Sequence, residues 1–474
     1  MSVAAPVIIP SLAFSSEPPL FAFHVLYRSS GGATVANAEK GALMKSTQRR
    51  VGRRDFLKGC AVAGAAALVP TYVPGKVLGL DGEVAPSAKV NMGAIGIGSR
   101  GNEDLGVFLG RNDVRFRAIC DVRKSRREYV KDRADKTYND TDCAMYKDME
   151  DLLIRDDIDA VLIATGDRWH TMASITAAKF GKDVYCEKPL SLTIQESRAL
   201  ADAVKRYGIV YQAGTQRRNI GNFMLAAEIV KSGKLGKLTE VHANTLWPAT
   251  HHDWFPAEPE PAVDEVDWDR WLGPCPWRPY NSRYVAGDWR NHFDFHGGGI
   301  LEWGSHTVDL CQWAAQKDDT APTRYEPQFN EDGSIAGHVW AYYADGVKLV
   351  MRSDGWLGLG TCSARYVGEE GWIETGDSGR MAVSSDALRS ELKYFGMPGT
   401  NPSTHIAEFV DCVKTRRNPA ANAAVAAQSH IASHCAYIAW QLKRPIEFDP
   451  VKEEFNDEEA NRMRTRAMRG PYTL

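Results

Sequence analysis

A glycine-rich turn directly after an apolar run is the feature that most restricts how this chain can fold. Residues Val90–Gly96 form a short apolar run, and Gly96-Ile97-Gly98-Ser99-Arg100-Gly101 follows the pattern G-x-G-x-x-G at its end. The glycines allow a tight turn, and they let the backbone approach a pyrophosphate at the N-terminus of the following helix. We therefore expect a dinucleotide to be bound by Gly96, Gly98, Ser99, Arg100 and Gly101.

An acidic residue stands where such a site holds a ribose. A second apolar run, Val114–Cys120, ends at Asp121, about 20 residues beyond the glycines, where a carboxylate binds the ribose 2′-hydroxyl. The negative charge of Asp121 would repel a 2′-phosphate, and this favours NAD over NADP. Arg123 and Arg126 lie close enough in the sequence to keep NADP as the less favoured alternative.

The alternation of strands and helices continues after the second strand. Further strands are predicted near Ala160–Thr165, Asp183–Glu187 and Ile209–Ala213, separated by stretches of helix length. This order is typical of a doubly wound parallel sheet, the Rossmann fold of the α/β class. We place this first domain at residues 89–215 and a second domain at residues 216–474.

Composition and charge exclude several classes of protein. A net charge of −3 over 474 residues does not suggest a nucleic-acid partner. No apolar run approaches the roughly 20 residues that a membrane-spanning helix needs. The nine cysteines include no C-x-x-C pair, which argues against a disulfide framework and against a thiolate zinc site.

The amino-terminal 88 residues read as an upstream segment with an export signal. Basic residues from Lys45 onwards precede a short Ala/Gly-rich apolar run, and residues 45–69 together have the order of a signal peptide. Arg53-Arg54-Asp55-Phe56-Leu57-Lys58 resembles the twin-arginine signal, which is read by a receptor and carries folded proteins. We expect a periplasmic or otherwise extracytoplasmic protein that starts at Met44 and is cleaved between about residues 70 and 88.

The second domain is predicted to be an α+β domain built on a largely antiparallel open sheet. A helix is expected at Asn219–Ser232 and a strand at Lys237–Trp247. Val339–Tyr343 and Val347–Arg352 flank an Asp-Gly turn and predict a hairpin. Helices near 403–415 and 423–443 close the chain.

Residues 247–289 differ from the rest of this domain because they hold six of the 13 tryptophans and seven prolines. Flat aromatic faces with a polar edge suit stacking on sugar rings, although such residues also anchor long loops. Downstream, Glu302, His306 and Asp309 fall at i, i+4 and i+7 and share one face of a predicted helix. A carboxylate one turn from a histidine can orient the ring and stabilise its charged form.

These features together resemble the Gfo/Idh/MocA oxidoreductases, the relatives of glucose–fructose oxidoreductase and inositol dehydrogenase. The resemblance runs from about residue 89 to the C-terminus. It rests on the glycine turn, Thr165–His170, Glu187-Lys188-Pro189 and Gly297–Asp309. Glu-Lys-Pro after an apolar strand is the most specific of these motifs.

The resemblance implies roles for individual residues. It places Lys188 beside the nicotinamide and the reacting hydroxyl, and it makes His306 the acid/base for that hydroxyl. Glu302 stands where the family has aspartate, so it either contacts substrate or supports His306. We expect the further cofactor contacts Thr165, Asp167, Trp169, His170 and Glu187, and the substrate contacts Arg217, Trp289, His292 and Asp309. His170 has an alternative role as a structural residue at the start of a helix.

Three functions remain open. The first is an NAD-dependent oxidoreductase that acts on a sugar, polyol or glycoside. The second is an NAD-dependent glycosidase that oxidises C3, eliminates the aglycone and reduces again, although such enzymes lack the lysine of Glu187-Lys188-Pro189. The third is a non-catalytic sugar sensor.

The scattered histidines show no H-E-x-x-H pattern, so no metal is expected. We expect a homo-oligomer formed through the C-terminal sheet.

Overall fold

The computed structural model describes residues 84–393, 395 and 398–474. The predicted export signal at residues 45–69 and the candidate start Met44 lie outside these residues. None of the helices in the described part of the chain is both long and apolar enough to cross a lipid bilayer.

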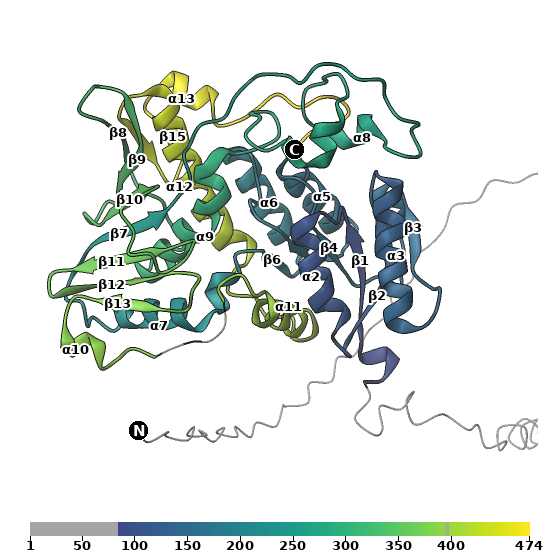
Figure 1. The fold of residues 1–474 in the computed structure, drawn as a ribbon, viewed down its shortest axis with the longest axis horizontal. Coiled ribbons are helices and arrows are strands. Elements are labelled where there is room, and N and C mark those ends of the chain that lie inside the picture. The colour runs from purple at the N-terminus through teal and green to yellow at the C-terminus, as the bar shows by residue number, and fades with distance from the viewer. Residues whose placement is uncertain (1–83, 394, 396–397) are drawn as a thin grey trace, which may run out of the picture. The chain divides into compact units, whose positions relative to one another are not determined.

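The first domain is a six-stranded parallel sheet with the strand order β3-β2-β1-β4-β5-β6 (Figure 1). The predicted Rossmann fold is therefore confirmed. Strand β3 is short, lies at the edge of the sheet and was not predicted from the sequence. The strands are β1 (Val90–Ile95), β2 (Val114–Cys120), β3 (Ala144–Tyr146), β4 (Ala160–Ile163), β5 (Asp183–Cys186) and β6 (Tyr211–Ala213). The helices are α2 (Ser99–Leu109), α3 (Lys124–Tyr138), α4 (Met149–Leu153), α5 (Asp167–Lys179) and α6 (Ile194–Tyr207), and a 3-10 turn, η2 (Pro86–Ala88), precedes β1.

Local sequence explains why these elements start and stop where they do. All four residues of β4 and of β5 are buried, as expected for central strands that helices cover on both faces. Helix α6 begins with a capping residue, because the side chain of Thr193 accepts the backbone N–H of Glu196. It ends at Gly208, whose positive φ of 65° suits glycine.

The second domain is built on a nine-stranded sheet with the order β13-β12-β11-β7-β10-β9-β8-β14-β15. Its neighbouring strands are antiparallel except β7 and β10, so the predicted, largely antiparallel sheet is confirmed. The strands are β7 (Leu238–Asn244), β8 (Arg324–Phe329), β9 (Ile335–Tyr342), β10 (Lys348–Arg352), β11 (Ala364–Gly368), β12 (Gly371–Thr375), β13 (Met381–Val383), β14 (Ile446–Asp449) and β15 (Glu454–Phe455).

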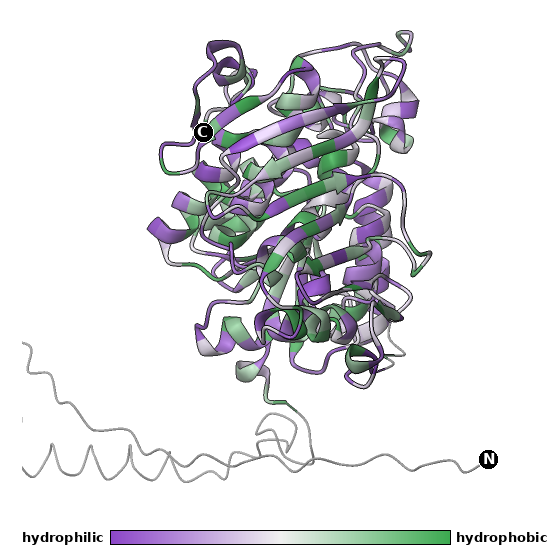
Figure 2. Ribbon diagram, turned by 90° about the vertical axis from the view of Figure 1, so that its left-hand side faces the viewer, coloured by the Kyte–Doolittle hydropathy of each residue, from purple (hydrophilic) through white to green (hydrophobic). Residues whose placement is uncertain are grey.

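Helices cover one face of this sheet, and the other face is open. Helices α7, α9 and α12 supply buried apolar residues to the same core as the strands. Figure 2 looks onto the open face, where hydrophilic and hydrophobic residues alternate along the strands. The helices of this domain are α7 (Gly221–Lys231), α8 (Trp268–Leu272), α9 (Gly298–Ala314), α10 (Asp386–Arg389), α11 (Ser403–Thr415), α12 (Ala423–Leu442) and α13 (Glu458–Arg462), with a 3-10 turn, η3 (Gln216–Asn219).

The tryptophan-rich segment belongs to the second domain in sequence but packs against the first. It arches over the carboxyl ends of the Rossmann strands (Figure 1) and contains α8 and a π-helical turn, η4 (Tyr284–Asp288). Backbone hydrogen bonds fix it there, from Lys124 N–H to Glu265 O at 3.0 Å and from Asp267 N–H to Val122 O at 3.1 Å. Trp268 and Trp271 stack on each other inside it, so most of its aromatic residues anchor the segment.

Helix α11 also crosses the division that we placed at residue 215. Its buried residues Ile406, Phe409 and Val410 pack in the same apolar cluster as β1 and β2. The rings of Phe409 and Phe108 lie 6.2 Å apart in an edge-to-face contact. The Rossmann core is therefore completed by a helix from the C-terminal part of the chain.

Candidate active site

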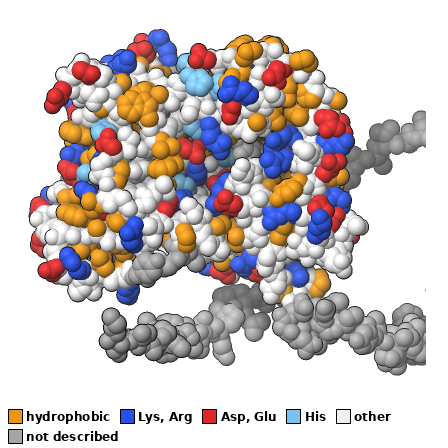
Figure 3. Space-filling view, in the orientation of Figure 1, with side chains coloured by type: hydrophobic (Ala, Val, Ile, Leu, Met, Phe, Trp, Pro, Cys, Tyr) orange, Lys and Arg blue, Asp and Glu red, His pale blue; other side chains and the backbone are white. Residues whose placement is uncertain are grey.

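A cavity of about 930 Å³ lies where the two domains and the tryptophan-rich segment meet. The space-filling view shows a hollow between the two halves of this face, with charged and histidine side chains around it (Figure 3). The cavity is lined at one end by the glycine turn and Asp121, and at the other by Lys188, Arg217, Glu302 and His306. This position, beyond the carboxyl ends of parallel strands, is where open α/β sheets bind ligands.

The glycine turn has the geometry that a pyrophosphate requires. Gly96 has a φ of +65°, and a Cβ atom there would lie 2.2 Å from Cγ2 of Thr165. A Cβ on Gly101 would lie 2.5 Å from Cβ of Ala164, so this glycine lets α2 pack closely on β4. No described side chain caps the first turn of α2, whose N–H groups remain available to an anion. The residues present therefore fit a dinucleotide.

Asp121 is buried at the end of β2 and is held by the backbone. Its carboxylate accepts the N–H of Ile97 at 3.2 Å and the N–H of Arg123 at 2.9 Å. Burial raises the pKa of Asp121, although Arg123 and these backbone N–H groups oppose the shift. The carboxylate thus lies directly beside the glycine turn, as the sequence predicted.

Helix α5 begins within the motif Thr165–His170, directly after Gly166. Asp167, Trp169 and His170 lie in the first turn of α5. Nδ1 of His170 lies 2.7 Å from the Pro189 carbonyl, and burial lowers the pKa of this ring, so the structural alternative for His170 has support. Nε1 of Trp169 donates to the Arg270 carbonyl at 2.9 Å and so anchors α8. Asp167, Trp169 and His170 line the cavity, as do Thr165 and Glu187.

Lys188 and Glu302 come from different domains and meet inside the cavity. Nζ of Lys188 donates to Oε1 of Glu302 at 3.0 Å and to the backbone carbonyl of Glu302 at 2.9 Å. Burial alone would raise the pKa of the Glu302 carboxyl. The Lys188 ammonium and a hydrogen bond from His296 outweigh burial and hold this pKa well below its usual range. Glu302 is therefore a carboxylate that compensates the charge of Lys188.

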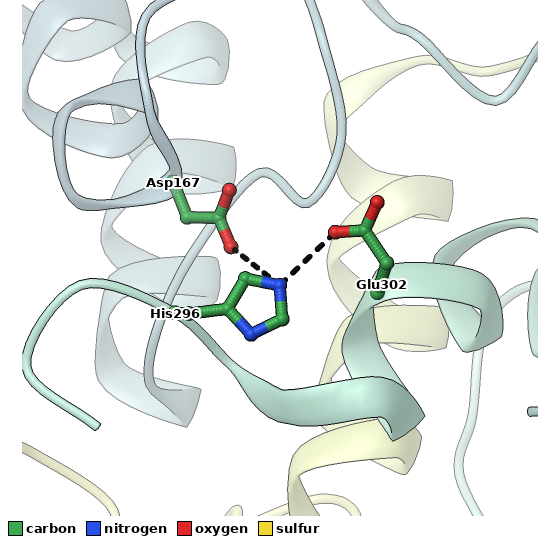
Figure 4. Close-up of side chains that lie close together, drawn as sticks. All are labelled: Asp167, His296 and Glu302. Atoms are coloured by element: carbon green, nitrogen blue, oxygen red, sulfur yellow. Dashed lines mark hydrogen bonds and ion pairs between the residues drawn. The ribbon is translucent and has the colours of Figure 1, made fainter. Parts of the chain in front are cut away.

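His296, which the sequence did not single out, lies between two carboxylates (Figure 4). Its Nε2 lies 3.1 Å from Oε2 of Glu302 and 3.9 Å from Oδ2 of Asp167. The Gly298 N–H donates to Nδ1 of the same ring at 3.0 Å, so the neutral ring carries its proton on Nε2. Oδ2 of Asp167 has no hydrogen-bond partner among the described residues, and burial raises the pKa of Asp167.

The three side chains Asp167, His296 and Glu302 place their ligand-type atoms within 4.8 Å of one another. A metal on Nε2 of His296 would need the ring proton on Nδ1, where the Gly298 N–H already points. The Lys188 ammonium also occupies the other oxygen of Glu302. Both features disfavour a cation at this position and favour a hydrogen-bonded network that orients Glu302.

His306 does not have the carboxylate partner that the helical spacing predicted. Its Nε2 instead lies 2.8 Å from Nη1 of Arg217, which can only donate. Nδ1 therefore carries the ring proton, and it has no partner among the described residues. Burial and the nearby Arg217 lower the pKa of His306 well below its ordinary value, so the ring is neutral. The expectation that Glu302 or Asp309 would stabilise a charged His306 was wrong.

Two predicted substrate residues lie outside the cavity, which corrects their assignment. Asp309 forms a buried ion pair with Arg218, with Nε and Oδ2 separated by 2.6 Å. His292 packs among aromatic rings, with Nδ1 2.9 Å from the Asp253 carbonyl, and burial lowers its pKa to about 4. The other two predicted substrate residues, Trp289 and Arg217, line the cavity.

Comparison with known proteins identifies the family. A profile described as an oxidoreductase family, C-terminal alpha/beta domain, matches residues 226–474, and that of the NAD-binding Rossmann fold of the same family matches residues 90–215. The chain is a member of the Gfo/Idh/MocA family of oxidoreductases.

Individual relatives resemble parts of the chain. A glycosyl hydrolase family 109 protein from Shewanella baltica is 34% identical over an alignment of 173 residues, and the match covers 32% of this chain and 37% of that protein. A myo-inositol 2-dehydrogenase from Thermotoga maritima is 30% identical over 148 residues, which are 31% of this chain and 42% of that protein. The matches thus span well under half the length of these curated relatives.

Solved structures show the same fold at lower identity. The myo-inositol 2-dehydrogenase from Lactobacillus plantarum aligns with a TM-score of 0.55 and 17% identity, covering 76% of this chain and 100% of that chain. The WlbA dehydrogenase from Chromobacterium violaceum, in complex with NADH and UDP-GlcNAcA, aligns with a TM-score of 0.57 and 16% identity. The alignment covers 77% of this chain and 98% of the WlbA chain.

Some residues that line the cavity had no signal in the sequence. Pro471, Tyr472 and Thr473 reach it from the C-terminal tail, and the ring of Tyr472 meets that of Trp169 edge to face at 5.3 Å. Arg469 holds this tail, since its Nη2 donates to the carbonyls of Asp269 at 2.7 Å and Gly273 at 3.0 Å. The tail has no hydrophobic period or motif from which this placement could be read.

Proposed function

We propose that this chain is an NAD-dependent oxidoreductase that transfers a hydride between a hydroxyl-bearing carbon of a sugar, polyol or glycoside and a tightly bound nicotinamide. The observation that carries the proposal is the contact of Lys188 with Glu302 at 3.0 Å, made across the two domains inside the cavity that also contains the glycine turn. A bound nicotinamide would accept or return the hydride. The family membership supports the same reaction class.

We propose that Lys188 handles the proton of the reacting hydroxyl. Before oxidation the Lys188 ammonium releases its own proton to solvent, Nζ then takes the proton of the hydroxyl, and the Glu302 carboxylate at 3.0 Å compensates the ammonium that results. His296 donates from Nε2 to Glu302 and fixes its orientation. His306 is a weaker candidate for the base, because its Nε2 already accepts a hydrogen bond from Arg217.

A second candidate is an NAD-dependent redox glycosidase, which the relatives named glycosyl hydrolase family 109 favour. Both reactions begin with the same oxidation, but the glycosidase cycle returns the hydride and regenerates its cofactor.

Incubation of the holoenzyme with a panel of glycosides, followed by NMR analysis of the products, distinguishes the two reactions. Release of the aglycone over many turnovers without added acceptor supports the glycosidase. Formation of a keto sugar in an amount of no more than one molecule per enzyme molecule supports the dehydrogenase. Neither product would be formed by a sugar sensor.

We propose NAD as the cofactor, because of the position of Asp121. Asp121→Ser should weaken NAD binding and narrow its advantage over NADP, since the 2′-phosphate would no longer meet a buried carboxylate. Competition titrations of the two nucleotides measure this ratio. Asp132→Ser, on the exposed side of α3, is the matched control. An unchanged ratio in Asp121→Ser would refute the role of this carboxylate.

The C-terminal tail should slow the release of the cofactor. Removal of residues 469–474 takes away the Arg469 contacts and Tyr472, which lines the cavity. We expect the truncated holoenzyme to exchange its nucleotide at least about tenfold faster, equivalent to about 1.4 kcal/mol. Exchange of bound nucleotide for labelled NAD measures the rate, and Tyr472→Phe, which keeps the ring, is the control. Equal rates in the full-length and truncated proteins would contradict this role.

We propose that the protein is exported by the twin-arginine route, a proposal based on the sequence at residues 45–69. Arg53→Lys combined with Arg54→Lys should leave the protein in the cytoplasm with its cofactor bound, because a receptor reads this signal. Fractionation of cells that express each form measures the distribution, and Arg49→Lys with Arg50→Lys is the control. Normal periplasmic accumulation of the first double variant would contradict the proposal.

We also propose that the open face of the nine-stranded sheet pairs with a second copy of the chain. Trp340 is exposed on this face, and Nζ of Lys348 lies 4.7 Å from its ring centre. The mass of the native protein in solution tests this proposal, with Trp340→Glu as the disrupting variant.

A further inference from the structure

A buried arginine in the wall of the cavity has no acidic partner among the described residues. Arg168 lies in the first turn of α5 and is only 6% exposed. Its Nε donates to the Trp271 carbonyl at 2.7 Å, whereas its Nη1 has no hydrogen-bond partner in the described part of the chain. Buried polar atoms in folded proteins nearly always have a partner, so this nitrogen points to a ligand.

Aromatic rings compensate the charge of Arg168 only in part. Its guanidinium carbon lies 3.5 Å from the ring centre of Trp271, 5.5 Å from that of Phe295 and 5.8 Å from that of Trp289. These ring faces attract a cation, but they offer Nη1 no oxygen acceptor. Burial lowers the pKa of Arg168 to about 10, which still leaves the side chain charged at neutral pH. The described residues thus leave a buried positive charge without a counter-ion, which is unfavourable.

The unpartnered nitrogen lies against Gly166, at the carboxyl end of β4. A Cβ atom on Gly166 would lie 2.4 Å from Nη1 of Arg168 and 3.5 Å from Cζ2 of Trp289. A side chain at this position would therefore collide with the guanidinium, and the glycine leaves room for it. Gly166 and Trp289 both line the cavity, so Nη1 belongs to the cavity wall.

This position is close to both ends of the cavity. The backbone before Gly166 runs beside the glycine turn, because the Gly98 N–H donates to the Ala164 carbonyl at 3.4 Å. The residue after Gly166 is Asp167, whose carboxylate lies 3.9 Å from His296 at the end that contains Lys188 (Figure 4). A ligand group at either end of the cavity is therefore close enough to be considered as the partner of the unpaired nitrogen.

We propose that Arg168 binds an anionic oxygen of a ligand inside the cavity, with Nη1 as a donor. Two groups could supply this oxygen: the pyrophosphate of the dinucleotide and a carboxylate on a sugar substrate. Arginine suits both, because its planar N–H donors match phosphate and carboxylate oxygens. The neighbouring glycine turn favours the pyrophosphate, which requires only the NAD-binding fold. The carboxylate rests in addition on the function proposed above.

Arg168→Gln tests the contribution of the terminal nitrogens. Nε2 of a glutamine is as many bonds from Cα as Nε of an arginine, so the variant can keep the hydrogen bond to the Trp271 carbonyl while it loses the charge and Nη1. If the pyrophosphate is the ligand, the variant should release its nucleotide about 10- to 100-fold faster, as expected for a lost hydrogen bond to a charged group. Exchange for labelled NAD measures the rate. Arg206→Gln, which removes an exposed charge on α6 outside the cavity, is the control.

Stability with and without nucleotide separates binding from packing. Arg168→Gln removes an uncompensated buried charge, so the nucleotide-free variant should be at least as stable as nucleotide-free wild type. If the pyrophosphate is the ligand, only the stabilisation that added NAD provides should become smaller. Chemical denaturation of the full chain measures both quantities. An equal loss of stability with and without NAD would mean that Arg168 only packs the tryptophan-rich segment, and this would contradict the proposal.

A matched pair of sugars distinguishes the two sources of the anion. Tryptophan fluorescence follows the binding of a methyl hexuronide and of the corresponding methyl hexoside to the nucleotide-loaded wild type and Arg168→Gln. Faster nucleotide release with an unchanged ratio of the two affinities assigns the pyrophosphate. A uronide preference that falls by about tenfold or more, with unchanged release, assigns the substrate carboxylate. If neither quantity changes, the proposal is refuted. Nucleotide release does not depend on turnover, so this result stands apart from any failure of the proposed oxidoreductase function.

Discussion

Lys188→Ala should lower kcat by about 10²–10⁴-fold while the nucleotide stays bound, because a positioned acid/base typically contributes this much. The side chain contacts Glu302 across the domains and not the glycine turn, so nucleotide binding does not depend on it. Single-turnover reduction of the bound nicotinamide measures the chemical step, and the nucleotide released on denaturation measures occupancy. Lys136→Ala, an exposed lysine on α3, is the control.

His306→Ala should lower kcat by a smaller factor than Lys188→Ala does. Arg217 occupies Nε2 of His306, and the ring is neutral and buried, so its loss removes packing beside the site and not the proton acceptor. A larger loss of kcat in His306→Ala than in Lys188→Ala would mean that substrate displaces Arg217, and the base would then be His306.

Asp309→Ala should lower the free energy of unfolding by about 3 kcal/mol, because it leaves the buried guanidinium of Arg218 without its closest partner. The effect should lie at the lower end of the range for broken buried pairs, since Asp318 remains 2.7 Å from Arg218. Chemical denaturation measures the change. The folded fraction should keep its selectivity among substrates, which a substrate residue would not allow.

Asp318→Ala provides the comparison for this variant. Its side chain is 33% exposed, whereas that of Asp309 is 1% exposed, so solvent can replace much of what it contributes. We expect Asp318→Ala to lower the free energy of unfolding clearly less than Asp309→Ala does. Equal losses would contradict the view that Asp309 is the principal counter-ion of Arg218.

The sequence predicted the Rossmann half of the molecule well because its signals are local. The glycine turn, the buried strand runs and the acid after β2 each follow from residues that are close in sequence. The position of Lys188 in the cavity follows from the same kind of local signal, since ligands of open α/β sheets bind beyond the carboxyl ends of the strands. The pairing of Lys188 with Glu302 depends on how two domains meet and could not be read from either motif alone.

The errors share one physical origin. Helical spacing correctly placed Glu302, His306 and Asp309 on α9, but it could not say what each would face. The turn η3 supplies Arg217 to His306 and Arg218 to Asp309, and these arginines replaced the partners expected within the helix. His296 and the C-terminal tail were missed because their positions are set by long-range packing without a local pattern.

Single-turnover reduction of the bound cofactor tests whether this chain is an oxidoreductase. The holoenzyme, with its nicotinamide fully oxidised, is mixed with neutral glycosides, and the absorbance of reduced nicotinamide is followed together with tryptophan fluorescence. We expect that a glycoside that binds also reduces the cofactor, and that deuterium on the reacting carbon slows this step. Binding of glycosides with no reduction of the cofactor, in wild type and in Lys188→Ala alike, would contradict it.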